Sequence, residues 1–352
     1  MIEYLARTFN HKSLAKNRRK CKWQYALLKT RPGGCYNLQV RILVTGGAGY
    51  IGSVLCQRLL RAGHEVVVLD ALFFGDRGIK TLLDNPGFSL VRGDIRNRRD
   101  IAEAIAGTEA VVHLAALVGE PAALRWPELN RAINIEGTRN LLELAGERLF
   151  IYASSCSVYG NQDGLVDEES PVMALGPYAE SRIEGEAMVR EMAEDYVILR
   201  FATVFGLSPR MRFDLMVNEF TLSAWRSGVI EIYNPGITRP FVHLSDLAVA
   251  ISGALETPGA RGQVINIGMG NFSKAELAGA IAKLTRAEVN EVKAGPDLRN
   301  YTISFKRMER VLGTRASVGI KEGAREILYA LERGEFPNPD DPVYYNHSPV
   351  YY

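Results

Sequence analysis

Cysteines are scarce in this chain of 352 residues, and long apolar runs are missing. The four cysteines form no CxxC pair, so the sequence predicts neither a disulfide framework nor a metal site. A reducing compartment, the cytoplasm, is therefore the expected location. No apolar run approaches the roughly 20 residues that a membrane-spanning helix needs, so no membrane partner is expected.

Net charge is also nearly missing, but the total of +2 averages two unlike segments. Residues 1–39 hold nine Lys or Arg and one acid, Glu3, for a balance of +8. The remaining residues hold 33 basic and 39 acidic side chains, for a balance of −6. An acidic body does not favour binding to nucleic acid, and no nucleic-acid partner is predicted.

The basic leader, residues 1–39, has no sustained apolar stretch of the kind that a secretory signal needs. We interpret it as a segment outside the native fold, with the native chain starting at or near Val40, just before the first predicted strand. A transit peptide for an organelle and a nucleic-acid or interaction arm are the alternatives that its charge leaves open.

With 47% apolar residues, the chain can fill one large α/β domain and a smaller one. Apolar strand patterns alternate with helical patterns, which predicts a parallel sheet covered by helices on both faces. Strands are expected at 41–44, 66–69, 88–91, 110–114, 149–153 and 197–201, and at 241–244 and 264–267, where the chain returns to the sheet. Helices are expected at 99–106 and 133–144, and most of 272–334 is expected to be helical.

A glycine-rich turn, Thr45–Gly52 (TGGAGYIG), lies between the first predicted strand and a helical pattern. Glycines there let the backbone turn tightly and approach a pyrophosphate, whose charge rests on the helix N-terminus. Asp70 ends the second strand eighteen residues after Gly52. Such an acid can accept both hydroxyls of an adenosine ribose and would repel a 2′-phosphate, which favours NAD over NADP. The coenzyme residues expected here are Gly46, Gly49, Tyr50, Ile51, Gly52 and Asp70.

The predicted fold is therefore a Rossmann-type, doubly wound parallel sheet of the α/β class, with a smaller, mostly helical C-terminal substrate domain. Ligands bind such sheets at the carboxyl ends of the strands, and the polar motifs of this chain follow its strands. The expected parts are an NAD-binding domain (40–206 and 237–268), a substrate domain (207–236 and 269–335) and a surface tail (336–352).

Tyr178 and Arg182 lie four positions apart in a predicted helix that Pro177 opens, so their side chains share one helix face. A tyrosine hydroxyl has a pKa of about 10, and a fixed cation beside it favours the phenolate. A phenolate can accept a proton from a sugar hydroxyl while a hydride leaves for the nicotinamide. Ser155, after the strand at 149–153, can orient the same oxygen. We predict Tyr178, Ser155 and Arg182 as the catalytic residues.

Together these motifs resemble those of the extended short-chain dehydrogenase/reductases, which include NAD-dependent nucleotide-sugar epimerases, dehydratases and dehydrogenases. The resemblance runs from about residue 40 to about residue 331. It is carried by TGGAGYIG, Asp70, Gly93-Asp94-Ile95, His113-Leu114-Ala115-Ala116, Ser155-x-x-Val-Tyr-Gly and Tyr178-x-x-x-Arg182. It implies that Asp94 and Ile95 lie by the adenine and that Leu114, Ala115 and Ala116 line the coenzyme groove. The resemblance also adds Asn134, Tyr178 and Arg182 to the expected coenzyme residues.

The same resemblance implies a nucleotide-diphosphate sugar as the substrate, and a homodimer is the expected assembly. Arg239 and Arg299 resemble the family's arginines that meet the diphosphate, and guanidinium forks match phosphate oxygens. Thr203 and Asn218 lie in segments that resemble the loop around the nucleotide, and Ser155 is also expected to touch the substrate. Many relatives have asparagine at the position of Thr203.

Two departures from the family pattern shape the expected reaction. The family has lysine where this chain has Arg182, and arginine keeps the charge but cannot release a proton near neutral pH. The family's 4,6-dehydratases have an Asp-Glu pair where this chain has Cys156-Ser157, which removes the general acid and base that eliminate water. We predict an NAD-dependent nucleotide-sugar 4-epimerase or C4 dehydrogenase. A catalytically weakened NAD(H)-binding relative and a reductase of a non-sugar carbonyl substrate are the alternatives left open.

Overall fold

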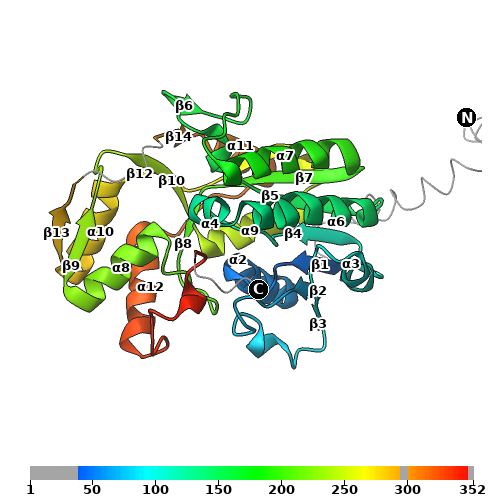
Figure 1. Cartoon of the computed structure of the whole chain (residues 1–352), viewed down its shortest axis with the longest axis horizontal. Coiled ribbons are helices and arrows are strands. Elements are labelled where there is room, and N and C mark those ends of the chain that lie inside the picture. The colour runs from blue at the N-terminus through cyan, green and yellow to red at the C-terminus, as the bar shows by residue number, and fades with distance from the viewer. Residues whose placement is uncertain (1–38, 294–299, 348–352) are drawn as a thin grey trace, which may run out of the picture. The chain divides into compact units, whose positions relative to one another are not determined.

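Seven strands form a parallel central sheet in the order β11-β7-β5-β4-β1-β2-β3 (Figure 1). The computed structural model describes residues 39–293 and 300–347. The expectations for the leader up to residue 38, for Arg299 and for the last five residues of the tail therefore lie outside the described residues. The strands of the central sheet are β1 (Arg41–Thr45), β2 (Glu65–Asp70), β3 (Phe88–Arg92), β4 (Ala110–His113), β5 (Leu149–Ser155), β7 (Asp195–Phe201) and β11 (Val264–Ile267).

Runs of apolar, largely β-branched residues explain why these strands lie in the interior. β1 reads Arg-Ile-Leu-Val-Thr, and its last four residues are buried. β2 reads Glu-Val-Val-Val-Leu-Asp, and its middle four residues are buried. Burial of successive residues means that both faces of the sheet are covered, as in a parallel sheet between two helix layers. The predicted Rossmann-type α/β fold is confirmed.

Helices cover both faces because the crossovers run in opposite directions from β1. The chain moves through α2 (Tyr50–Arg61) from β1 to β2, and through α6 (Thr138–Ala145) from β4 to β5 on the other side. Right-handed crossovers in opposite directions place their helices on opposite faces. The first layer holds α2, α9 (Leu244–Glu256) and α11 (Lys306–Leu312), and the second holds α3 (Arg98–Ile105), α6 and α7 (Pro177–Met192). None of the helices in the described ranges is long and apolar enough to cross a membrane.

The helix expected at 133–144 is present, but its first part is π-helical instead of regular α-helix. Residues Ala132–Gly137 form a π-helical turn, and the regular α-helix starts at Thr138. The Thr138 hydroxyl donates a hydrogen bond to the Asn134 carbonyl at 2.7 Å. The Asn134 side chain meanwhile accepts from the backbone N–H of Leu117 at 2.8 Å. These side-chain bonds stabilise a local widening that hydrophobic periodicity alone does not reveal.

Only one of the two later strands returns to the central sheet, which corrects the expectation for 241–244. β11 pairs with β7 and takes the edge of that sheet. β10 (Thr238–His243) instead lies in a separate three-stranded sheet, parallel to β8 (Thr203–Phe205) and antiparallel to β12 (Gly270–Ser273). Because β11 occupies the edge beside β7, no position is left there for β10.

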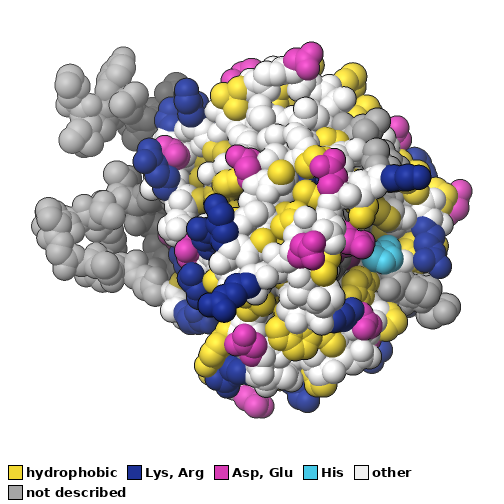
Figure 2. Space-filling model, turned by 90° about the vertical axis from the view of Figure 1, so that its left-hand side faces the viewer, with side chains coloured by type: hydrophobic (Ala, Val, Ile, Leu, Met, Phe, Trp, Pro, Cys, Tyr) yellow, Lys and Arg dark blue, Asp and Glu magenta, His cyan; other side chains and the backbone are white. Residues whose placement is uncertain are grey.

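A second apolar core lies among the helices of the predicted substrate domain. It contains residues of α8 (Met216–Ser227), α10 (Lys274–Thr285), α12 (Ile320–Glu332) and β9 (Val229–Ile232). β9 pairs in parallel with β13 (Glu288–Glu291). On the face of the molecule that carries these elements, acidic and basic side chains are intermixed with apolar ones (Figure 2).

The tail was expected on the surface, and most residues of its described part are partly or fully exposed, but Phe336, Tyr344 and Asn346 are buried. Phe336 and Tyr344 are each 5% exposed. Tyr344 packs edge-on against Phe213 and Phe336, and its carbonyl accepts the Phe213 N–H at 3.1 Å. Aromatic side chains that bury this much apolar surface hold the segment in place. The shorter elements are α4 (Glu120–Arg125), α5 (Pro127–Arg131), β6 (Leu165–Val166), β14 (Thr302–Ile303) and the turns η1 (Lys80–Leu82), η3 (Cys156–Tyr159), η4 (Pro258–Ala260) and η5 (Pro342–Tyr344).

Candidate active site

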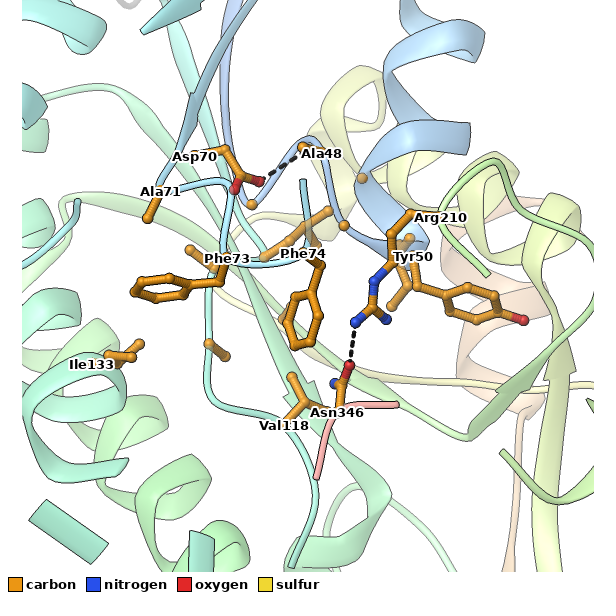
Figure 3. Close-up of a pocket in the computed structure, with 18 of the residues that line it drawn as sticks. Ala48, Tyr50, Asp70, Ala71, Phe73, Phe74, Val118, Ile133, Arg210 and Asn346 are labelled. Atoms are coloured by element: carbon orange, nitrogen blue, oxygen red, sulfur yellow. Dashed lines mark hydrogen bonds between the residues drawn. The ribbon is translucent and has the colours of Figure 1, made fainter. Parts of the chain in front are cut away.

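A pocket opens at the carboxyl ends of β1, β2, β4 and β5, the edge at which parallel sheets of this kind bind ligands (Figure 3). It joins segments that are far apart in the sequence, from the turn after β1 to the first turn of α7. All residues predicted for the coenzyme line this pocket except Asn134. These lining residues are Gly46, Gly49, Tyr50, Ile51, Gly52, Asp70, Asp94, Ile95, Leu114, Ala115, Ala116, Tyr178 and Arg182.

The glycine-rich turn has the backbone geometry that a pyrophosphate site needs. Gly46 has a φ of +73°, and a Cβ there would lie 2.8 Å from the Ala115 nitrogen. A Cβ on Gly52 would lie 2.2 Å from the Gly46 carbonyl oxygen. In the described part of the chain no side chain caps the N-terminus of α2, whose N-cap is Gly49. The positive end of this helix is therefore directed at whatever the pocket holds.

Asp70 holds the glycine-rich turn against the end of β2. Its carboxylate accepts the Ala48 N–H at 2.9 Å and the Leu72 N–H at 2.8 Å. Burial raises the pKa of the Asp70 carboxyl, while these two N–H groups and the Arg210 guanidinium act in the opposite direction. Each carboxylate oxygen has a second lone pair, which can accept a ribose hydroxyl.

Arg182 reaches from α7 into the pocket beside Tyr178. Its guanidinium carbon lies 5.3 Å from the centre of the Tyr178 ring and 5.7 Å from that of Tyr152. The side chain is buried, and Nη1 donates to the Ala153 carbonyl at 3.3 Å. Its Nε and Nη2 make no hydrogen bond with any described residue. Buried donors that lack a partner fit the hydroxyl groups of a dinucleotide ribose bound in the same pocket.

A carboxylate from a distant segment caps the helix that carries Tyr178. Glu120 accepts the N–H groups of Tyr178 and Ala179 at 3.2 and 3.1 Å. Pro177 is the first residue of α7, as predicted, and Gly176 precedes it. A Cβ on Gly176 would lie 2.5 Å from a Glu120 carboxylate oxygen, so glycine makes room for the cap. The cap places a negative charge at the positive end of α7, which stabilises this helix start.

The two serines at the end of β5 have different surroundings. The predicted catalytic Ser155 is half-buried, and its hydroxyl accepts the Ser157 N–H at 3.1 Å at the start of η3. Ser155 is not among the residues that line the pocket, whereas Ser154 is. The Ser154 hydroxyl donates to Glu186 at 2.6 Å, and Glu186 forms a buried ion pair with Arg200. The role of Ser155 in catalysis stays a prediction.

The described residues predicted to bind substrate lie outside this pocket. Asn218 is fully buried, and its side chain bonds the Gly206 N–H, the Tyr50 hydroxyl and the Arg212 carbonyl. Thr203 lies in β8. Arg239 is buried in β10, with its guanidinium carbon 5.3 Å from the centre of the Tyr301 ring. Their substrate contacts stay predictions.

Asn134 lies behind the residues that line the pocket. It is fully buried, and its side chain bonds both the N–H and the carbonyl of Leu117, at 2.8 and 2.9 Å. Ser181 and Asn130 lie within hydrogen-bond distance of its amide nitrogen. Asn134 thus ties the segment after β4 to α7, and it positions coenzyme-lining residues instead of lining the pocket itself.

Several residues that line the pocket were not predicted from the sequence. Phe73 and Phe74 come soon after Asp70, so their place after a strand was a usable signal. Arg210 lies in the segment that resembles the loop around the nucleotide, but its meeting with Asn346 had no signal in the sequence, because it depends on how the tail folds back over the pocket (Figure 3). The remaining lining residues without a predicted role are Ala48, Ala71, Gly75, Gly93, Val118, Ile133, Ala153, Ser154, Phe201 and Arg212.

A pocket of this construction defines a Rossmann-type enzyme that works with a bound dinucleotide. Comparison with protein families narrows this class, because residues 42–268 match the NAD dependent epimerase/dehydratase family. The chain belongs to this family, and its coenzyme is NAD. Within residues 39–293 and 300–347, no cluster of three or more His, Cys, Asp or Glu side chains could hold a metal ion.

Individual relatives agree with this membership. The chain is 32% identical over 326 residues to a Bacillus subtilis (strain 168) protein described as an uncharacterized UDP-glucose epimerase, YtcB, covering 84% of this chain and 100% of that protein. It is 31% identical over 311 residues to dTDP-glucose 4,6-dehydratase of Streptomyces niveus, covering 82% and 92%. UDP-glucuronic acid 4-epimerase from Bacillus cereus, solved with UDP-glucuronic acid and NAD, matches with a TM-score of 0.76 and 28% identity, covering 83% and 99%. The predicted family resemblance is confirmed.

Proposed function

We propose that this enzyme is an NAD-dependent nucleotide-sugar 4-epimerase or C4 dehydrogenase, with Tyr178 as the catalytic base. The observation that carries the proposal is the Tyr178–Arg182 pair, which lines the same pocket as the glycine-rich turn. Hydride removal from a carbinol carbon requires a nearby group that takes the hydroxyl proton, and we assign this task to Tyr178.

Each step of the oxidation has a residue assigned to it. The Tyr178 oxygen accepts the proton of the C4 hydroxyl as the C4–H bond breaks and the carbon becomes a ketone. Bound NAD supplies the hydride acceptor. The Arg182 guanidinium, 5.3 Å from the Tyr178 ring centre, puts a fixed positive charge beside this tyrosine. In an epimerase Tyr178 returns the proton when the hydride comes back to the opposite face of the keto sugar; in a dehydrogenase the ketone leaves.

Other titratable groups near the strand ends are unsuited to this role. His113 lies between the hydroxyls of Thr45 and Thr138, at 2.7 and 3.0 Å. Burial, and next the charge of Arg182, lower the pKa of His113 to about 3, so it is neutral at physiological pH. His113 does not line the pocket.

A dehydratase reaction is disfavoured, although some relatives are named as dehydratases. Elimination of water needs a general acid and a base after the serine position, and this chain has Cys156-Ser157 there. Cys156 is buried and its thiol lies 3.4 Å from the Arg200 carbonyl oxygen. Burial raises the pKa of this thiol, which leaves it a poor acid at neutral pH.

The substrate class rests on two supports. Relatives and solved neighbours are named for UDP- and dTDP-sugars. Strand β10 also offers buried Arg239, a residue suited to a diphosphate. An uncharged carbonyl substrate would need no such cation.

A panel of UDP-, dTDP- and GDP-sugars tests the proposal. The purified chain is incubated with each sugar, products are identified by NMR, and NADH absorbance is followed. An epimerase gives two C4 epimers without net NADH, whereas a dehydrogenase gives a keto sugar and one NADH for each turnover. Bound NAD with no turnover on any sugar would contradict the proposal and favour a catalytically weakened relative.

We also propose that the enzyme is a homodimer in the reducing cytoplasm. Both cysteines in the described ranges, Cys56 and Cys156, are buried free thiols, which suits a reducing compartment. Sedimentation velocity at micromolar concentration tests the assembly, and a monomeric mass would contradict it. Localisation of the tagged full chain to an oxidising compartment would contradict the proposed location in the cytoplasm.

A further inference from the structure

Three segments that are remote in the sequence meet at the NAD pocket around Arg210. Phe74 comes from the turn after β2, Arg210 from the loop after β8, and Asn346 from the folded-back tail (Figure 3). All three line the pocket together with the glycine-rich turn. None of them belongs to the catalytic pair, and none of the three was predicted to bind the coenzyme.

The Arg210 guanidinium is held in a defined direction. Its central carbon lies 3.8 Å from the centre of the Phe74 ring, which is a stacked cation–π contact. Its Nη2 donates a hydrogen bond to the Asn346 side-chain oxygen at 2.8 Å. Arg210 is only 3% exposed, so its long side chain has little rotamer freedom left to lose when an anion binds.

The partner Asn346 is itself anchored to the loop that carries Arg210. Its backbone N–H donates to Asp214 at 3.2 Å. Two residues earlier, the hydroxyl of Tyr344 accepts from Arg77 at 2.7 Å. The described part of the tail is thus built into one side of the pocket.

The charges around Arg210 indicate which ligand this arrangement can bind. Among the charged lining residues, Asp94 pairs with Arg96 at 2.6 Å and Arg212 pairs with Asp214 at 2.7 Å. Asn346 is neutral, so its hydrogen bond orients the Arg210 guanidinium without adding a negative charge, while the carboxylates of Asp70 and Asp214 also lie close enough to feel the charge of Arg210. The pyrophosphate of a dinucleotide brings two negative charges to the glycine-rich turn, and a planar guanidinium matches phosphate oxygens.

We propose that Arg210 is a coenzyme-binding residue that contacts the pyrophosphate of NAD, aimed there by Phe74 and Asn346. The C-terminal tail is then part of the coenzyme site, and loss of its contact with Arg210 weakens NAD retention. The proposal is independent of which nucleotide sugar the enzyme converts, because it concerns binding of the coenzyme alone.

Calorimetric titration of the coenzyme-free full chain with three ligands tests the contact. NAD and ADP-ribose contain the pyrophosphate, and adenosine does not. Arg210→Gln is expected to weaken the binding of NAD and ADP-ribose by about 10- to 100-fold and to leave the affinity for adenosine unchanged. Arg226→Gln is the matched control: Arg226 also touches the tail, through Asp340 at 2.9 Å, but it does not line the pocket. The Arg226→Gln variant should bind all three ligands with the affinities of the wild type.

Asn346→Asp tests the orienting role with almost no change of shape. The new carboxylate would pair with Arg210 and compete with the pyrophosphate. The binding of NAD and ADP-ribose should therefore weaken, while the affinity for adenosine and the melting temperature stay near those of the wild type. Unchanged NAD and ADP-ribose affinity in folded Arg210→Gln would overturn the proposal. An equal loss for adenosine would also overturn it, because the effect would then be general damage to the pocket. If Arg210→Gln does not fold, unchanged affinities in Asn346→Asp decide against the proposal.

Discussion

The Glu120 carboxylate caps the helix that carries Tyr178, accepting the N–H of Tyr178 at 3.2 Å and that of Ala179 at 3.1 Å. Glu120 begins α4 just after Val118, a residue that lines the NAD pocket. A short stretch of chain therefore joins the wall of the coenzyme pocket to the backbone of the proposed catalytic base. This connection makes Glu120 a positioning residue, since it acts through the placement of Tyr178.

Removing the cap should reduce turnover without removing the coenzyme. Glu120→Ala leaves two N–H groups at the start of α7 without their acceptor, at a cost of about 0.5–2 kcal/mol in helix stability. We expect kcat to fall while the Kd for NAD stays the same. Glu120→Gln keeps one carbonyl acceptor and should fall less. A kcat for Glu120→Ala equal to that of wild type would show that the cap does not position Tyr178.

Asp70 should set the preference for NAD. Asp70→Ala removes the acceptor for the adenosine ribose and should weaken NAD binding by about 1.5–3 kcal/mol, the range for hydrogen bonds to a charged group. Because burial raises the pKa of Asp70, NAD binding by wild type should strengthen as pH rises through that pKa. Binding titrations with NAD and NADP check both points. Tighter binding of NADP by wild type would contradict the role given to Asp70.

His113 should make the fold sensitive to acid. Its pKa is lowered to about 3 in the folded chain from an ordinary 6.5, so between these values the unfolded chain binds more protons. Stability therefore falls as pH drops through this window, by about 2 kcal/mol at pH 5 for a 1.5-unit span. In His113→Gln this contribution disappears. Urea unfolding at pH 7.5 and pH 5 measures it, and an equal loss in wild type and variant would refute the assignment.

Local motifs explain which parts of this site were predictable. The turn from Gly46 to Gly52 and the acid Asp70 are adjacent to strands, so their places follow from chain connectivity. Tyr178 and Arg182 share a face because of helical spacing. Asn346 lies 136 positions from Arg210, and only packing of the tail brings them together. The tail is held by aromatic side chains with no repeating pattern, which carry no periodic signal.

The serines show a second limit of sequence reasoning. Ser154 and Ser155 are consecutive in β5, and successive side chains of a strand point to opposite faces. Choosing Ser155 instead of Ser154 therefore replaces a residue that lines the pocket with one that caps η3. The π-helical turn before α6 has a similar origin: it depends on the long-range bonds of Asn134 to Leu117.

Arg182→Lys should lower activity although it restores the family's residue. The guanidinium stacks near the rings of Tyr178 and Tyr152 and bonds the Ala153 carbonyl, and a lysine cannot reproduce this planar arrangement. We expect kcat to fall by roughly 10-fold with the charge retained. Steady-state kinetics on the sugar found in the substrate panel give the answer. Equal or higher turnover would mean that Arg182 is a weakened substitute for lysine.

Turnover of Tyr178→Phe is the most direct measurement of the central claim. The substitution removes the hydroxyl and leaves the ring in its contact with Arg182. We expect kcat to fall by about 10²–10⁴-fold, while the Kd for NAD and the melting temperature remain those of the wild type. Full turnover in folded, NAD-bound Tyr178→Phe would show that Tyr178 is not the base, because another group would then have to take the proton.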